Sequence, residues 1–157
     1  MRNISFALTT QQIRDRTKTV TRRRGTWWST VLKPGDVLCA VEKSQGIKRG
    51  GLVRLGTIRV VSVRTELLLE ILADKLNGYD NEESAREGFP MMDGHQFVRM
   101  FRRHMGGPPD QSVTRIEFEY IHCGCSHADV EHGDTGCDFC PCAASRFGFH
   151  RFPEPCP

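Results

Sequence analysis

The residues best suited to chemistry are cysteines and histidines gathered near the end of the chain. Of the 157 residues, positions 122–142 contain five of the seven cysteines and three of the six histidines. Cys137 and Cys140 form a Cys-x2-Cys pair, a spacing that lets two thiolates bind one tetrahedral zinc ion from a tight turn. The stretch has too few aliphatic residues to build a core, so it needs another source of stability. The pattern predicts a structural zinc site.

More potential ligands are present than the four that a structural zinc ion takes. The preferred ligands are Cys123, Cys125, Cys137 and Cys140, and the possible replacements are His127, His132 and Cys142. Disulfides and a tail without fixed structure are the two alternatives. We favour metal because the sequence shows neither a signal peptide nor an apolar run of about 18 to 20 residues, which predicts a reducing, cytoplasmic location without membrane contact.

A second candidate site comes from basic residues in the first part of the chain. Residues 1–64 contain 14 lysines and arginines but only three acidic residues, a net charge of +11. Residues 65–121 carry −5 and residues 122–157 carry −3, which leaves +3 for the whole chain. A basic segment of this kind attracts a polyanion. The alternative is a set of scattered, solvated charges.

The predicted nucleic-acid-binding residues are Arg22, Arg23, Arg24, Trp27, Trp28, Lys48 and Arg49. The three arginines are contiguous, and an aromatic ring that stacks on a base contributes about 1 to 3 kcal/mol. Neighbouring side chains on a strand point to opposite faces, so one of the two tryptophans is predicted to be buried and the other exposed. Lys48 and Arg49 suit either phosphate contact or a solvated loop.

The elements that must position these residues follow from periodicity and from turn chemistry. Alternating and β-branched runs predict strands over residues 4–8, 18–23, 37–41, 52–64 and 113–121. Helical spacing of apolar residues predicts helices over 66–76, 81–87 and 96–104. A short helix is predicted to begin at Thr9 or Thr10, where the threonine hydroxyl would cap it, and to end near residue 16.

The order of these elements bears on the fold class. Helices do not alternate with strands along the chain, which argues against a doubly wound parallel sheet and for an α+β fold or a small barrel. The composition, with 38% hydrophobic and 26% charged residues, is ordinary for a globular protein.

Several motifs, taken in order, resemble the ASCH (activating signal cointegrator homology) domain family. Residues 16–23, RTKTVTRR, resemble the family's G-x-K-T-x-T-x-R stretch, although Asp15 or Arg16 stands where the family has glycine. A turn at 33–36 leads into a strand, and residues 87–89 (EGF) resemble the family's E-G-F element. The resemblance covers residues 3–121. It implies a PUA-like small β-barrel with short flanking helices over 1–121, which leaves 122–157 as a zinc-knuckle-like tail.

The resemblance also implies a nucleic-acid or nucleoside ligand and a set of catalytic residues. Some ASCH members are similar to amidohydrolases that deacetylate a modified cytidine, and others are similar to ribonucleases. The lysine, threonine and glutamate of the amidohydrolase type fall on Lys18, Thr21 and Glu87. A lysine made neutral in a cleft can activate a hydroxyl, and a glutamate can carry the proton. On one continuous strand Lys18 and Thr21 would face opposite sides, unless the strand bulges or ends between them.

Three hypotheses follow for the function. The first is a module that binds RNA or a modified nucleoside through a basic cleft. The alternative is a hydrolase, of the acetylcytidine amidohydrolase or ribonuclease type, that uses Lys18, Thr21 and Glu87. The second alternative is an adaptor that holds a protein partner through the zinc-binding tail.

Overall fold

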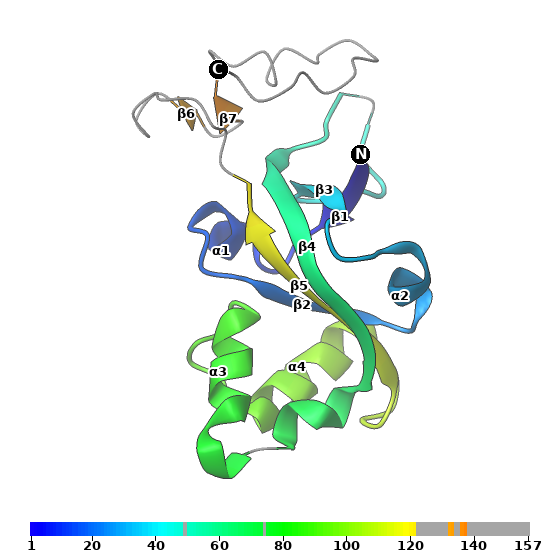
Figure 1. Ribbon diagram of the computed structural model, residues 1–157, viewed down its shortest axis with the longest axis vertical. Helices are drawn as coiled ribbons and strands as arrows, with labels where there is room; N and C mark the ends of the chain where they lie inside the picture. Colours follow the sequence, from blue (N-terminus) through cyan, green and yellow to red (C-terminus); the bar gives the residue numbers. More distant parts are fainter. Residues whose placement is uncertain (49, 74, 122–131, 134–135, 138–157) are drawn as a thin grey trace.

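The computed structural model describes residues 1–48, 50–73, 75–121, 132–133 and 136–137 (Figure 1). Its main feature is a curled sheet of five strands, in the order β1-β3-β4-β5-β2. The strands are β1 (Arg2–Ser5), β2 (Val20–Arg24), β3 (Val37–Val41), β4 (Arg54–Leu67) and β5 (Ser112–Tyr120). Strand β1 runs parallel to β3, and the other pairs are antiparallel. The sheet is a half-barrel whose two edges are β1 and β2, as expected for an α+β, PUA-like fold.

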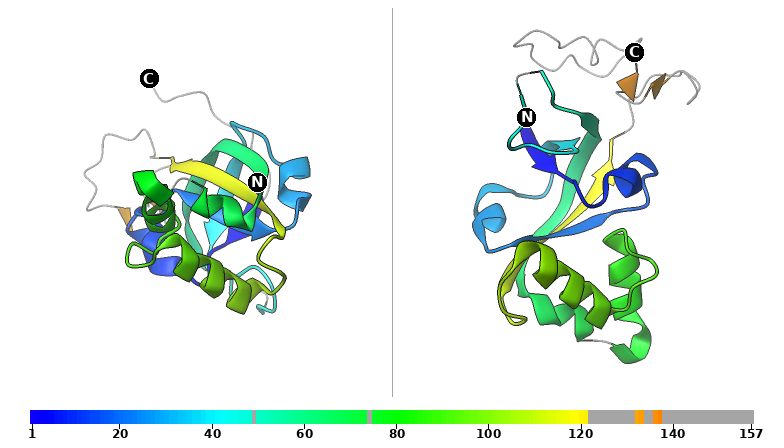
Figure 2. Two further views of the ribbon diagram at one scale, coloured as in Figure 1. Left: turned by 90° about the horizontal axis from the view of Figure 1, so that it is seen from below. Right: turned by 180° about the vertical axis from the view of Figure 1, so that it is seen from behind.

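Short helices flank this sheet. They are α1 (Thr10–Arg14), α2 (Trp27–Val31), η1 (Leu68–Leu72), η2 (Lys75–Asn77), α3 (Tyr79–Arg86) and α4 (Gly94–Met105). The four from η1 to α4 lie between β4 and β5 in sequence, and they gather at one end of the sheet in both vertical views (Figures 1 and 2). A separate hairpin pairs β6 (His132–Gly133) with β7 (Gly136–Cys137). Among the described residues no helix is long and apolar enough to cross a membrane.

Two apolar clusters form the core. The first fills the curl of the sheet and consists of Ile4, Phe6, Ile13, Leu32, Leu38, Ala40, Ile58, Val60, Ile116 and Phe118. The second joins the helices to the end of the sheet and consists of Leu68, Ile71, Phe97, Val98, Phe101 and Val113. Burial of such side chains contributes about 1.5 to 3 kcal/mol each before the cost of ordering them. The junction between the two clusters is where the buried charges lie.

The predicted helix over 66–76 is wrong at its start. Strand β4 continues to Leu67, and 3₁₀ helices η1 and η2 follow it. Glu66 and Leu68 are buried while Leu67 is exposed, which is the alternation of a strand. The strand continues because Glu66 pairs across the sheet with Val113 and directs its carboxylate to a buried arginine, Arg22. Leucine spacing alone carries no sign of this tertiary partner.

Two smaller predictions near the N-terminus also differ. The first strand covers Arg2–Ser5 rather than 4–8. The first helix has Thr9 at its cap position, but the Thr9 side chain makes no capping hydrogen bond. The Thr10 hydroxyl donates instead to the Phe6 carbonyl oxygen at 3.0 Å. The loop from Ser5 to Thr9 therefore folds back between sheet and helix, where it forms one wall of a cavity.

The two tryptophans lie on helix α2 and not on a strand. Trp27 is 57% exposed, whereas Trp28 packs against the first apolar cluster. Their unequal burial was predicted, but its cause is the amphipathic position of a short helix instead of strand alternation. The guanidinium of Arg2 lies 5.5 Å from the Trp27 ring centroid, so Trp27 already has a cationic neighbour.

Candidate ligand pocket

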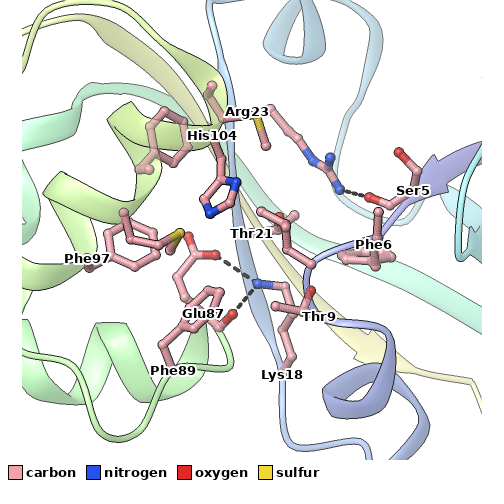
Figure 3. Close-up of a pocket in the computed structure, with 15 residues that line it drawn as sticks. Ser5, Phe6, Thr9, Lys18, Thr21, Arg23, Glu87, Phe89, Phe97 and His104 are labelled. Atoms are coloured by element: carbon pink, nitrogen blue, oxygen red, sulfur yellow. Dashed lines mark hydrogen bonds and ion pairs between the residues drawn. The ribbon is translucent and has the colours of Figure 1, made fainter.

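A cavity of about 130 Å³ lies between the Ser5–Thr9 loop, strand β2, the end of α3 and helix α4 (Figure 3). Its polar lining residues are Ser5, Thr9, Lys18, Thr21, Arg23, Glu87 and His104. Its apolar lining residues are Phe6, Ala7, Leu8, Phe89, Phe97, Met100, Phe101 and Met105. The cavity therefore combines aromatic and aliphatic walls with a few hydrogen-bonding groups, which is the usual make-up of a small-ligand site.

The sequence-predicted trio of Lys18, Thr21 and Glu87 meets in this cavity. Strand β2 begins at Val20, so Lys18 precedes it and strand alternation does not separate Lys18 from Thr21. Glu87 arrives from the other side, at the C-cap of helix α3. Lys18 and Thr21 are neighbours in the chain, and Glu87 joins them only because the helical part docks on the sheet edge.

Lys18 and Glu87 form a buried ion pair. The Lys18 Nζ lies 2.8 Å from the Glu87 Oε2 and also donates to the Glu87 backbone carbonyl oxygen. Burial lowers the pKa of Lys18, while the Glu87 carboxylate acts in the opposite direction. Among the described residues the Thr21 hydroxyl makes no hydrogen bond, so it is available to a ligand.

Arg22 has a different role from the one predicted for it. Its side chain is fully buried, and it binds Glu66 and Glu83 at 2.8 Å and Glu87 at 3.2 Å. The guanidinium is therefore occupied inside the protein and does not face an external phosphate. Basic charge from residues 1–64 is neutralised here by acidic charge from residues 65–121, which explains part of the charge asymmetry in the sequence.

Glu83 is the centre of the same cluster, which we call the buried ion network: Lys18, Arg22, Glu66, Glu83, Glu87 and Arg115. Arg115 contacts both Glu83 carboxylate oxygens, with its Nη2 at 2.8 Å from Oε1 and its Nε at 2.9 Å from Oε2. Burial alone would raise the pKa of Glu83, but hydrogen bonds and ion pairs with Arg115 and Arg22 lower it to about 2. The carboxylate is ionised at neutral pH.

Arg23 points into the cavity, as expected for the next residue along the strand. Its Nη2 donates to the Ser5 carbonyl oxygen, and its guanidinium lies 5.2 Å from the Phe6 ring centroid. Because Ser5 ends β1 and Arg23 belongs to β2, this side chain bridges the two edges of the half-barrel. Burial lowers the pKa of Arg23 to about 10, with the Glu87 carboxylate opposing the shift.

The mouth of the cavity includes residues outside the sequence motifs. Leu8, His104 and Met105 line the cavity and are exposed. Arg24 lies beside them, because its Nη1 donates to the Met105 carbonyl oxygen at 3.1 Å. His104 follows Phe97 and Phe101 at helical spacing, and that periodicity was the signal that could have identified it.

The remaining predicted residues lie elsewhere. Neither Trp27 nor Trp28 lines the cavity, and Lys48 lies in an exposed loop away from it. Arg49 lies outside the described residues, as do five predicted zinc ligands: Cys123, Cys125, His127, Cys140 and Cys142. His132 and Cys137 are described only as backbone partners in the β6–β7 hairpin. In the part of the chain that the structure describes, no group of side chains suited to a metal ion is present.

Comparisons with known proteins identify the fold. Neither family models nor curated proteins match the sequence. Among solved structures, the crystal structure of an ASCH domain from Lactobacillus crispatus JV V101 has a TM-score of 0.51 and 14% identity, covering 76% of this chain and 78% of that chain. At this identity the similarity shows a shared fold alone. The fold agrees with the one implied by the motifs of residues 3–121.

Two further solved structures match with TM-scores below 0.5, which is too low to support a conclusion about fold or function. Hypothetical protein PH0355 has a TM-score of 0.49 and 17% identity, covering 76% of this chain and 96% of that chain. Protein EF3133 from Enterococcus faecalis V583, described with the family model DUF984, has a TM-score of 0.45 and 16% identity, covering 81% and 85%.

The buried ion network predicts a large effect for Glu83→Gln. Loss of this carboxylate leaves Arg115 and Arg22 with uncompensated buried charge, so we expect the unfolding free energy to fall by about 3 kcal/mol or more. Glu119→Gln is the matched control, because Glu119 pairs with Arg59 on the surface and such a pair contributes at most about 1 kcal/mol. Urea denaturation of the three proteins at pH 7 measures both changes, and equal losses would contradict the network's importance.

The same titrations repeated at lower pH test the state of the Glu83 carboxylate. Its folded pKa of about 2 lies below the ordinary value of 4.5, so its stabilisation is complete above pH 4.5 and is lost as the pH falls towards 2. The expected loss is about 3 kcal/mol over this window. It should be smaller in Glu83→Gln, and an unchanged pH dependence in that variant would refute the assignment.

Proposed function

We propose that this protein, which has the fold of an ASCH domain, binds a nucleobase of RNA or of a modified nucleoside in the cavity beside Lys18. The observation that supports it most is the composition of that cavity, where aromatic walls meet the free Thr21 hydroxyl and two basic side chains. A base has two apolar faces and a rim of hydrogen-bonding groups, so it matches both parts of this lining.

The size of the cavity supports a ligand group no larger than a small ring. An apolar cavity of about 150 Å³ holds a benzene molecule, and the present cavity has about 130 Å³. A six-membered pyrimidine ring is therefore a better match than a larger group, and the sugar would remain at the mouth, beside Leu8 and His104. Phe6 and Phe89 supply aromatic surface, which interacts favourably with a base.

Binding of nucleosides tests this proposal directly. Thr21→Val keeps the shape of the side chain but removes the hydroxyl, so we expect affinity for the best-bound nucleoside to fall about five- to tenfold, the effect of one hydrogen bond. Isothermal titration calorimetry with the four ribonucleosides, N4-acetylcytidine and a short single-stranded RNA gives the dissociation constants.

Thr65→Val is the control, because Thr65 is exposed on β4 and its hydroxyl contacts Ser29, away from the cavity. Its affinities should equal those of the wild type. If wild-type protein binds neither the nucleosides nor the RNA, the proposed function is incorrect.

A second candidate function is hydrolysis of an N-acylated nucleoside, favoured by the meeting of Lys18, Thr21 and Glu87 in one cavity. Neutral Lys18 would take the hydroxyl proton of Thr21 as Oγ1 bonds to the acyl carbon and the carbonyl electrons move onto oxygen. The carbon–nitrogen bond then breaks, and the leaving amine receives that proton through Lys18 or Glu87. Water attacks the resulting ester, giving one proton to Lys18 and then to the departing Thr21 oxygen.

Turnover of N4-acetylcytidine tests this second candidate. Lys18→Ala should lower the rate by about 10² to 10⁴-fold if Lys18 is the general base. Lys33→Ala is a suitable control, since Lys33 lies in the turn before β3 and does not line the cavity. Cleavage of single-stranded RNA is assayed in parallel for the ribonuclease alternative. Equal turnover by wild type and Lys18→Ala, or none by either, would eliminate a lysine-dependent hydrolase.

The zinc-binding tail and its role in holding a protein partner remain a separate proposal. Support comes from the Cys-x2-Cys spacing and from the hairpin in which His132 and Cys137 are backbone partners. Purified full-length protein is expected to contain about one equivalent of zinc by mass spectrometry of metals. Cys137→Ser with Cys140→Ser should remove it, whereas Cys39→Ser should not, because Cys39 is buried in β3. A metal-free wild-type protein after purification with supplied zinc would contradict the site.

A further inference from the structure

One positive charge in the cavity has no carboxylate at ion-pair distance among the described residues. Lys18 is paired with Glu87, and Arg22 is surrounded by three glutamates. Arg23 lines the same cavity, yet none of its contacts within the described part of the chain is an ion pair with a carboxylate. Its contacts are the Ser5 carbonyl oxygen and the Phe6 ring, which are neutral. Glu87 therefore acts on Arg23 only through space, and the described part of the cavity has one guanidinium without a direct ion pair.

The hydrogen-bonding capacity of Arg23 is also incomplete. Its Nε is buried and has no hydrogen-bond partner among the described residues. A buried charged group without full pairing is costly, so it is a strong site for an anion that can reach it. Arginine suits this role, since its planar donors form charge-assisted hydrogen bonds with phosphate and carboxylate oxygens.

We infer that the ligand is a phosphorylated nucleotide, either a nucleoside monophosphate or a residue of an RNA strand, and that Arg23 binds its phosphate. The inference rests on the proposed binding of a base in the cavity. A phosphodiester or a phosphomonoester carries at least one negative charge, so either can form the direct ion pair that Arg23 lacks among the described residues. The cavity has room for one small ring only, so the phosphate lies at its edge, on the β2 side where Arg23 is followed by the exposed Arg24.

The test compares each ribonucleoside with its own 5′-monophosphate and with a short single-stranded RNA. Calorimetric titrations use wild type, Arg23→Gln, Arg23→Lys and the control Arg59→Gln, whose side chain pairs with Glu119 on the sheet surface. We expect the monophosphate or the RNA to bind wild type at least about tenfold more tightly than the nucleoside, the effect of one charge-assisted hydrogen bond. Arg23→Gln should abolish this preference, Arg23→Lys should keep part of it, and Arg59→Gln should keep all of it.

Wild-type titrations alone can overturn the inference, which matters because Arg23→Gln also removes the bridge to Ser5. Equal affinity for nucleoside and phosphorylated ligand would refute the role of Arg23 and leave the proposed function intact. Failure of every ligand to bind would refute both. A preference for RNA over the monophosphate identifies a phosphodiester as the source of the phosphate, and the reverse identifies a phosphomonoester. Inorganic phosphate, titrated as a competitor, should weaken monophosphate binding to wild type.

Discussion

The structure depends on keeping several charges buried at the junction between sheet and helices. Arg22 of β2 contacts Glu66 of β4, Glu83 of α3 and Glu87 at the end of that helix. Removal of ions from water is expensive, and their mutual attraction offsets that cost only when every member is paired. The network therefore requires the sheet and the helices to meet in one arrangement. An apolar junction, in contrast, would allow the helices to slide along the sheet.

This constraint also builds the cavity. Glu87 is held at one carboxylate oxygen by Arg22 and at the other by Lys18, so its position is fixed from two sides. The half-barrel leaves its edge strands β1 and β2 unpaired with each other, and the cavity lies next to that opening. Arg23 bridges the same opening through the Ser5 carbonyl. The structural role of Arg22 and the proposed ligand-binding role of Arg23 therefore belong to two adjacent arginines on opposite faces of one strand.

The division of roles between Arg22 and Arg23 changes the mode of nucleic-acid binding that we expect. The sequence suggested a basic face made by many residues, whereas Arg22 and Lys18 have internal partners and the tryptophans lie away from the cavity. What remains in the described part of the chain is a small cavity with one guanidinium that has no direct ion pair, and an exposed arginine near the mouth of that cavity. Recognition of a single base with its phosphate agrees better with this geometry than a broad electrostatic surface does. Part of the positive charge of residues 1–64 is explained by the acidic residues that these side chains contact after folding.

The sequence by itself determined the α+β class, the five strands within a few residues, and the trio of Lys18, Thr21 and Glu87 through motif resemblance. These features depend on local periodicity, turn chemistry and short motifs, which a sequence carries directly. Only the tertiary structure decided that β4 extends through Glu66, that Arg22 is buried while Arg23 faces the cavity, and that His104 stands at its mouth. These depend on contacts between residues far apart in the chain, such as Arg22 and Glu83, and a charged side chain shows no sign of its partner until the chain has folded.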